Sequence, residues 1–119
     1  MEARLIVGNR DLAASNGAIF ERRNPVTGRV ATHAAAASLK DAAAAVDASA
    51  QAFRLWSQMG PNARRTLLLK GADSVERGGQ ELIAAMMAET GATEAWGAFN
   101  VRLAANMLRE AGRRYHESA

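Results

Sequence analysis

The spacing of apolar residues changes once along the chain, near residue 38. Before that point, short apolar stretches alternate with polar residues and are separated by turn signals, a pattern typical of half-exposed strands. The pair Gly8-Asn9 can supply the positive φ angles of a tight hairpin turn, and Asn24–Gly28 contains a second turn. Strands are therefore expected over 4–7, 11–14, 18–23 and 29–34. Together, residues 1–37 predict a β-hairpin followed by a small β meander.

From residue 38 to residue 119 the apolar residues recur every three or four positions, which predicts a segment of four helices. Ser38, with Asp41 three residues later, is expected to cap the first helix. Pro61 is suited to the first position of the second helix, Gly78-Gly79 should stop it, and Gly91 should end the third. The apolar positions of these three helices are Leu39, Ala42, Val46, Ala50, Phe53 and Trp56; Leu68, Ala72 and Val75; and Leu82, Ile83, Met86 and Met87.

The fourth expected helix, Thr93–Gly112, carries more apolar residues than one buried face requires. Thr93 can cap it, and Glu94 lies in its first turn, where the helix dipole favours an acidic side chain. One apolar stripe consists of Trp96, Phe99, Leu103 and Met107, and another consists of Ala98, Val101, Ala105 and Leu108. Two stripes predict a helix that packs on two sides. The pattern does not decide which of the two stripes packs inside the protein and which faces another partner.

The composition predicts one globular region of 119 residues, mostly α with an N-terminal β region, and an alanine-rich core. No apolar run approaches the roughly 20 residues that cross a bilayer, so we expect a cytoplasmic protein without membrane contact. The net charge of +3 raises the possibility of nucleic-acid binding. However, acids are interspersed with the arginines, as in Asp73–Arg77 and Glu110–Arg114 at helical i,i+4 spacing. We therefore expect a solvated surface and no nucleic-acid partner.

The usual catalytic and ligand-binding patterns are missing from the sequence. It contains no cysteine, no Gly-rich phosphate-binding loop and no serine nucleophile motif. His33 and His116 show no metal-ligand spacing, so structural or exposed roles are expected for both. The residues with most potential for ligand contact are Trp96, Phe99 and Asn100. They could form an aromatic wall with one orienting amide, or the rings could pack in a core while Asn100 bonds a backbone group.

In order along the chain, several motifs resemble the start of the NAD(P)-dependent aldehyde dehydrogenases. They are LIVGNRDL, the turn NPVTG, the alanine-rich helix ending in FRLW, the proline-opened helix with RRTLLLKGAD, and EL followed by ETG. The final stretch WGAFNVRLAANMLREAG is most similar to the salicylaldehyde and vanillin dehydrogenase branch, which acts on aromatic aldehydes. The resemblance covers nearly the whole chain.

The resemblance implies that the chain is the N-terminal meander and outer helical part of a cofactor-binding domain. In this family the cofactor motif, nucleophilic cysteine, glutamate base and oxyanion asparagine lie downstream, so no catalytic, cofactor-binding or metal residue can be assigned here. NAD or NADP would serve the parent enzyme, whereas this piece is expected to bind neither and to be inactive. The helix matching Thr93–Gly112 borders the substrate tunnel. The resemblance therefore makes Trp96, Phe99, Asn100, Leu103 and Met107 tunnel candidates for an aldehyde substrate.

Two hypotheses follow for the chain as a whole. In the first, it is an N-terminal fragment of an aldehyde dehydrogenase that oxidises aromatic aldehydes to carboxylic acids. In the second, it is a free-standing helical module that works by assembly without catalysis. The last helix keeps two apolar stripes with no later element to cover them, which favours the fragment. The same exposure predicts homo-oligomers formed through apolar helix faces.

Overall fold

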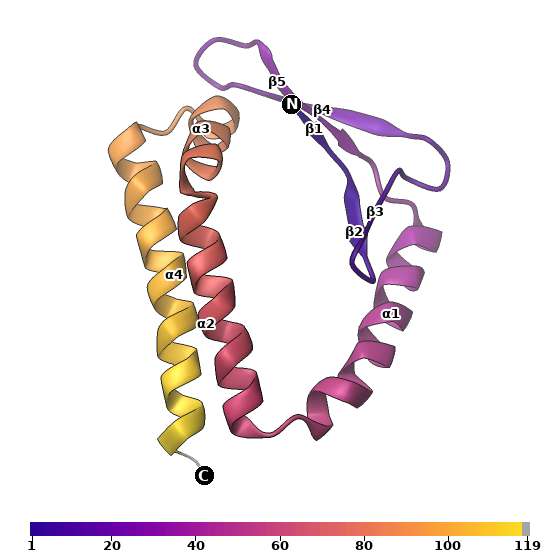
Figure 1. Cartoon of the computed structure of the whole chain (residues 1–119). Coiled ribbons are helices and arrows are strands. Elements are labelled where there is room, and N and C mark those ends of the chain that lie inside the picture. The colour runs from indigo at the N-terminus through magenta and orange to yellow at the C-terminus, as the bar shows by residue number, and fades with distance from the viewer. Residues whose placement is uncertain (118–119) are drawn as a thin grey trace. The chain divides into compact units, whose positions relative to one another are not determined.

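The computed structural model describes the backbone of residues 1–117 and the side chains of residues 1–114. Contacts divide the chain into two compact units, residues 1–58 and residues 59 onward. The first contains β1 (Glu2–Ala3), β2 (Leu5–Val7), β3 (Arg10–Leu12), β4 (Ile19–Arg23), β5 (Val30–Ala35) and α1 (Leu39–Gln58). The second contains α2 (Pro61–Arg77), α3 (Gly79–Thr90) and α4 (Glu94–Glu117) (Figure 1). The chain is thus mostly helical with a short N-terminal strand region, as the sequence predicts.

The strands of the first unit form two separate sheets. Strands β2 and β3 form the predicted antiparallel hairpin, with Leu5 opposite Leu12. Its turn residues Gly8 and Asn9 have φ angles of 57° and 60°, so both adopt the left-handed conformation that such turns require. The other sheet has the order β1-β5-β4. This arrangement is more complex than a meander because, in the order along the chain, β2 and β3 come between β1 and β4 but form a sheet of their own.

Only part of the three-stranded sheet follows from local sequence signals. Strands β4 and β5 are antiparallel neighbours joined by the predicted Asn24–Gly28 turn, in which Asn24 Oδ1 accepts the backbone N–H groups of Val26 and Thr27 at 2.9 and 3.0 Å. Strand β1 pairs in parallel with β5, with Glu2 opposite His33. This pairing joins segments about 30 residues apart, so no turn motif in the sequence predicts it.

A cluster of hydrogen bonds fixes the start of α1. Asp41 Oδ2 accepts the backbone N–H of Ser38 at 2.8 Å, and Ser38 Oγ accepts the backbone N–H of Asp41 at 3.2 Å. This reciprocal pair confirms the predicted cap. The same carboxylate also accepts the backbone N–H of Ser15 at 3.1 Å, and the hydroxyls of Ser15 and Ser38 lie 2.9 Å apart. Asp41 therefore ties the loop after β3 to the helix N-terminus.

Most apolar residues predicted to share one face of α1 are exposed within the first unit. Leu39, Val46 and Phe53 are uncovered, and only Trp56 is half-buried. The side of α1 near the hairpin instead presents small residues, because Ala45, Ala48 and Ala52 line a cavity of about 270 Å³ together with β2 and its turn. The size of the side chains, as well as their polarity, decides which side of α1 approaches the hairpin.

In the second unit, α2 and α4 run side by side in opposite directions and α3 connects them (Figure 1). The contact between the helices is built from small residues. Ala72 and Ala105 are fully buried. A Cβ atom added at Gly97 would lie 3.1 Å from Ile83 Cγ2, so a side chain there would fit only if Ile83 moved by a few tenths of an ångström. Small residues in this seam permit the short helix-to-helix distance.

A salt-bridge cluster joins α2 and α4 beside this seam. Arg109 donates to both carboxylate oxygens of Glu76 at 2.7 and 2.8 Å, and to Asp73 Oδ1 at 3.1 Å. The hydrogen bonds from Arg109 lower the pKa of Glu76. Of the two i,i+4 spacings noted in the sequence, Glu110 and Arg114 form an ion pair at 3.4 Å, whereas Asp73 accepts from Arg109 and Arg77 donates to Ser74 Oγ at 2.8 Å. The fork-shaped guanidinium satisfies two carboxylates, which an i,i+4 pattern cannot anticipate.

Most helix ends in the second unit lie where the sequence predicts them, but α4 continues to Glu117, past its predicted end at Gly112. Pro61 is the first residue of α2, and Gly78 links α2 to α3. Gly91 ends α3 with a φ of 70°, and its N–H donates to Met87 O at 3.1 Å. The backbone N–H of Trp96 donates to Thr93 Oγ1 at 3.3 Å at the start of α4. Among the described residues, no helix is long and apolar enough to cross a membrane.

The Asp41 cluster predicts an acid-sensitive contribution to stability. The backbone N–H of Ser38, followed by that of Ser15, lowers the pKa of Asp41 to about 2. Because this folded-state pKa is below the unfolded value of about 3.9, the stabilisation is present above about pH 4 and is lost as pH falls towards 2. We expect the melting temperature of Asp41→Asn to depend less on pH over this window than that of the parent chain. Asp47→Asn, on the exposed side of α1, should keep the parent dependence, and identical slopes for all three chains would contradict the assignment.

The helical seam predicts opposite effects for two glycine substitutions. Gly97→Leu should lower the free energy of unfolding by about 1–3 kcal/mol, since the new side chain would overlap Ile83. Gly71→Ala should raise it by up to about 1 kcal/mol, because alanine is the better helix former. A Cβ at Gly71 would lie 3.8 Å from Leu108 Cδ1, an ordinary contact distance. Denaturant unfolding measures both changes, and a Gly97→Leu chain as stable as the parent would show that α4 and α3 are not closely packed.

Candidate functional site

The two apolar stripes of α4 face different surroundings in the structure. Trp96, Phe99, Leu103 and Met107 are 58%, 44%, 44% and 65% exposed. On the other stripe, Ala105 is fully buried, and Ala98, Val101 and Leu108 are half-buried. A Cβ added at Gly79 would lie 3.3 Å from Val101 Cγ1, which places that stripe against α3. The structure thus distinguishes stripes that the sequence left equivalent, and the four large side chains lie outward.

The exposed stripe begins with a pair of stacked aromatic rings. The ring centroids of Trp96 and Phe99 are 5.4 Å apart, and their planes differ by 24°. This offset, nearly parallel arrangement is favourable for aromatic pairs. The pair also presents exposed aromatic surface in the second unit, since Trp96 and Phe99 are 58% and 44% exposed. Such a surface suits contact with another aromatic ring, and it offers no group for acid–base or nucleophilic chemistry.

Asn100 lies one turn beyond Trp96 and is half-buried. Its Nδ2 donates to the backbone carbonyl of Trp96, four residues earlier, at 2.8 Å. This is the backbone bond that the more cautious interpretation of the sequence expects. The bond uses the amide nitrogen and leaves Oδ1 for other contacts. All five candidate residues therefore come from one helix, and its packed stripe holds the helix in place.

The remaining chemistry-bearing side chains do not form a catalytic arrangement. His33 lies on β5, with its Nε2 3.7 Å from Glu21 Oε1, and the side chain of His116 lies outside the described residues. Among the described residues, no group of three or more His, Cys, Asp or Glu side chains could hold a metal ion. Gly78, Gly79 and Gly91 form helix ends, and Val101 lies against Gly79, so they do not form a phosphate-binding loop.

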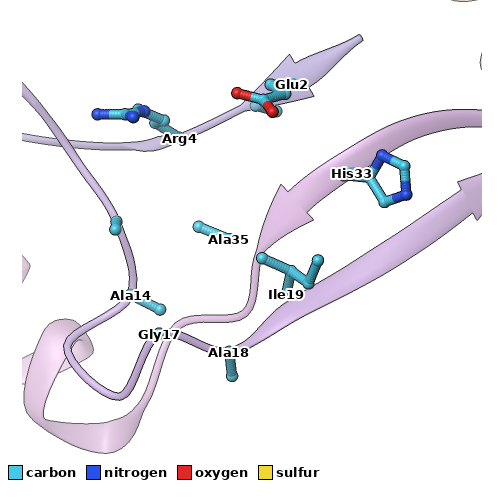
Figure 2. Close-up of a pocket in the computed structure, with 10 residues that line it drawn as sticks. Glu2, Arg4, Ala14, Gly17, Ala18, Ile19, His33 and Ala35 are labelled. Atoms are coloured by element: carbon cyan, nitrogen blue, oxygen red, sulfur yellow. The ribbon is translucent and has the colours of Figure 1, made fainter.

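A cavity of about 360 Å³ lies in the first unit, between β1, the loop after β3 and the ends of β4 and β5. Figure 2 shows Ala14, Ala35 and Ile19 around it, with Glu2 and His33 on neighbouring strands. Its walls are mainly small apolar side chains, and none of the five candidate residues lines it. The lining residues include no serine, threonine, cysteine or lysine. The cavity therefore adds no catalytic centre to the face on α4.

The fold and the order of its motifs can now be compared with known proteins. The model of the aldehyde dehydrogenase family matches residues 12–118 of this chain. The chain belongs to the aldehyde dehydrogenase family. The match includes every helix and the whole candidate face, so the resemblance noted in the sequence is confirmed.

Two curated relatives show how much of such an enzyme the chain represents. Vanillin dehydrogenase from Pseudomonas fluorescens is 50% identical over 111 residues, covering 93% of this chain and 23% of the relative. Salicylaldehyde dehydrogenase from Pseudomonas putida is 40% identical, also covering 93% of this chain and 23% of the relative. The chain thus spans about a quarter of the length of these enzymes.

Solved structures support the same membership. The salicylaldehyde dehydrogenase of Pseudomonas putida G7, complexed with salicylaldehyde, superposes with a TM-score of 0.92 at 40% identity. That superposition covers 95% of this chain and 23% of that chain. PnpE in complex with nicotinamide adenine dinucleotide gives a TM-score of 0.88 at 32% identity, over 94% of this chain and 23% of that one. This family member therefore has the fold of the matching region in an NAD-complexed relative.

Proposed function

We propose that this chain is the N-terminal part of a longer, cytoplasmic NAD(P)-dependent enzyme that oxidises aromatic aldehydes to carboxylic acids. The exposed, stacked pair Trp96–Phe99 carries the proposal, because it offers an exposed aromatic surface on a helix whose other side packs closely. The names of the relatives agree with this substrate class: vanillin, salicylaldehyde and, at 30% identity, a benzaldehyde dehydrogenase from Bacillus subtilis. No nucleic-acid or membrane partner is proposed.

In this proposal the exposed face of α4 forms one wall of the substrate tunnel. Trp96 and Phe99 contact the aromatic ring of the aldehyde by stacking, while Leu103 and Met107 extend the apolar wall along the helix. Asn100 contacts a substituent of the ring. Burial of an aromatic ring against such a wall favours binding through both removal of apolar surface from water and ring–ring geometry. These residues orient the substrate and take no part in bond making.

The chemistry and the cofactor belong to the remainder of the longer enzyme. The sequence has no cysteine to attack the aldehyde as a thiolate. The residues present also do not fit a dinucleotide, because the glycines after α2 sit at helix ends and one of them is packed against Val101. We therefore assign NAD or NADP binding to the remainder, and no step of hydride transfer to this chain.

Substrate contact and catalysis can be tested separately in a fusion protein, called the joined enzyme below. In the joined enzyme, this chain replaces the matching 111 residues of Pseudomonas fluorescens vanillin dehydrogenase. The isolated 119-residue chain should form no NADH from benzaldehyde or salicylaldehyde, whereas the joined enzyme should form it. Trp96→Ala in the joined enzyme should raise KM roughly three- to tenfold for benzaldehyde, but less for propanal, which has no ring to stack.

Trp56→Ala serves as the matched control, since it removes the chain's other tryptophan from α1. It should not discriminate between the two aldehydes. Equal changes of KM for benzaldehyde and propanal in the Trp96 variant would remove this residue from the substrate wall. NADH formation by the isolated chain would refute the assignment of catalysis and cofactor binding to the remainder of the longer enzyme.

The second candidate function is assembly through the exposed apolar faces. Homo-oligomer formation is compatible with this function and with a role as part of an aldehyde dehydrogenase. In the isolated chain, the Trp96 stripe is large enough to drive self-association. Sedimentation over a concentration series should show association of the parent chain, and Leu103→Glu should reduce it by placing a charge in the stripe. Asn62→Glu, at an exposed position on α2 and thus outside the stripe, should change the association less. A monomeric parent chain at all concentrations would contradict association through this face.

A further inference from the structure

The hydrogen bond within α4 determines which end of the Asn100 amide faces outward. Nδ2 lies 2.8 Å from the backbone carbonyl oxygen of Trp96. A carbonyl oxygen only accepts hydrogen bonds, so the NH₂ end of the amide must face it. The Oδ1 end consequently lies on the side of the amide away from the helix backbone. The polar group presented beside the stacked rings is thus an acceptor held in a defined orientation.

The Oδ1 atom of Asn100 can still accept hydrogen bonds. Within the part of the chain that the structure describes, the bond to Trp96 is the hydrogen bond assigned to the Asn100 side chain, and it occupies the nitrogen. An amide oxygen has two lone pairs available for donors. Trp96 lies one helical turn before Asn100, and side chains four residues apart are neighbours on a helix surface, so the acceptor lies beside the first of the two stacked rings. A ring lying on that surface brings its substituents to Oδ1.

We propose that Asn100 is a specificity-determining residue that selects aromatic aldehydes whose ring carries a hydrogen-bond-donating hydroxyl group. This inference rests on the proposed function and narrows its substrate class. A neutral phenol donates to Oδ1, whereas a methoxy group at the same ring position has no hydrogen to donate. Methylation of the hydroxyl leaves the acceptor without its partner as the site closes around the ring, which costs binding free energy.

The orientation also fixes how selectivity responds to ionisation of the substrate. A phenolate has lost its donor, and its negative charge faces the partially negative Oδ1 atom. Preference for the hydroxylated ring therefore falls as pH rises through the pKa of the substrate phenol. An amide presenting NH₂ outward would do the reverse, since it would donate to the phenolate. The pH profile of selectivity thus reports which end of Asn100 meets the substrate.

The experiment uses the joined enzyme and matched substrates: the three hydroxybenzaldehydes, each paired with the methoxybenzaldehyde substituted at the same position. The readout is kcat/KM for the hydroxybenzaldehyde divided by kcat/KM for its methoxy partner. Asn100→Leu, which has similar volume and no acceptor, should lower the ratio about three- to tenfold for at least one position, as expected for loss of one hydrogen bond. Asn100→Ala should give the same direction. The ratio of the unsubstituted joined enzyme should decline above the pKa of the phenol.

The matched control is Asn62→Leu, the same substitution at an exposed position of α2. Asn62 lies on a different helix from the five candidate residues, so the ratio of this variant should equal that of the parent. Unchanged ratios in both Asn100 variants at all three positions, with helical circular dichroism retained, would overturn the assignment while leaving aromatic-aldehyde oxidation in place. A parent ratio that rises on phenol ionisation would also overturn it. Failure of the joined enzyme to oxidise any of these aldehydes would instead refute the proposed function, and the Asn100 assignment with it.

Discussion

The close approach of α4 to α2 and α3 is the constraint on which the rest of the second unit depends. Gly97 allows α4 to pack closely on Ile83, where an added side chain would force Ile83 to move, and Ala105 is fully buried. The residues of α4 that lie closest to its neighbours, Gly97 and Ala105, are small, and Val101 and Leu108 pack on the same side, whereas the large side chains of the Trp96 stripe lie outward. Packing density, and not a binding requirement, thereby places Trp96 and Phe99 on the exposed face. The Arg109 cluster with Glu76 and Asp73 joins the same helices by charge-assisted bonds beside the seam.

That arrangement explains how a chain without catalytic groups can contribute to an enzyme. Recognition of an aromatic ring needs a rigid apolar surface and one oriented polar atom, and a single packed helix can supply both. Attack on an aldehyde and hydride transfer need a nucleophile and a bound dinucleotide; the sequence has no cysteine, and we propose that the remainder of a longer enzyme supplies both. Family membership and coverage of about 23% of the vanillin dehydrogenase relative agree with such a division. We therefore infer a wall of the substrate site whose support comes from the seam.

Local signals in the sequence predict much of this fold. Ser38 and Asp41 form the expected cap, Gly91 adopts the expected positive φ, and Gly8-Asn9 forms the hairpin turn. Contacts between distant segments were not predictable in this way. The parallel pairing of β1 with β5 and the bond between Asp73 and Arg109 depend on tertiary structure, which overrides the i,i+4 pattern. Hydrophobic periodicity also could not rank the two stripes of α4, because both are apolar; the sizes of Gly97 and Ala105 decide between them. The five candidate residues could be named from sequence and resemblance, but the orientation of the Asn100 amide required coordinates.

Hydroxyl-radical footprinting of Trp96 tests the central claim most directly. The isolated chain and the joined enzyme would be oxidised with and without benzaldehyde, in the absence of cofactor, and the modification of Trp96 and Trp56 measured by mass spectrometry. The account predicts rapid modification of Trp96 in the isolated chain, since this residue is 58% exposed there. It further predicts that benzaldehyde protects Trp96, and not Trp56, in the joined enzyme. Modification of Trp96 in the joined enzyme at a rate that benzaldehyde leaves unchanged would contradict the assignment of the α4 face as a wall of the substrate site.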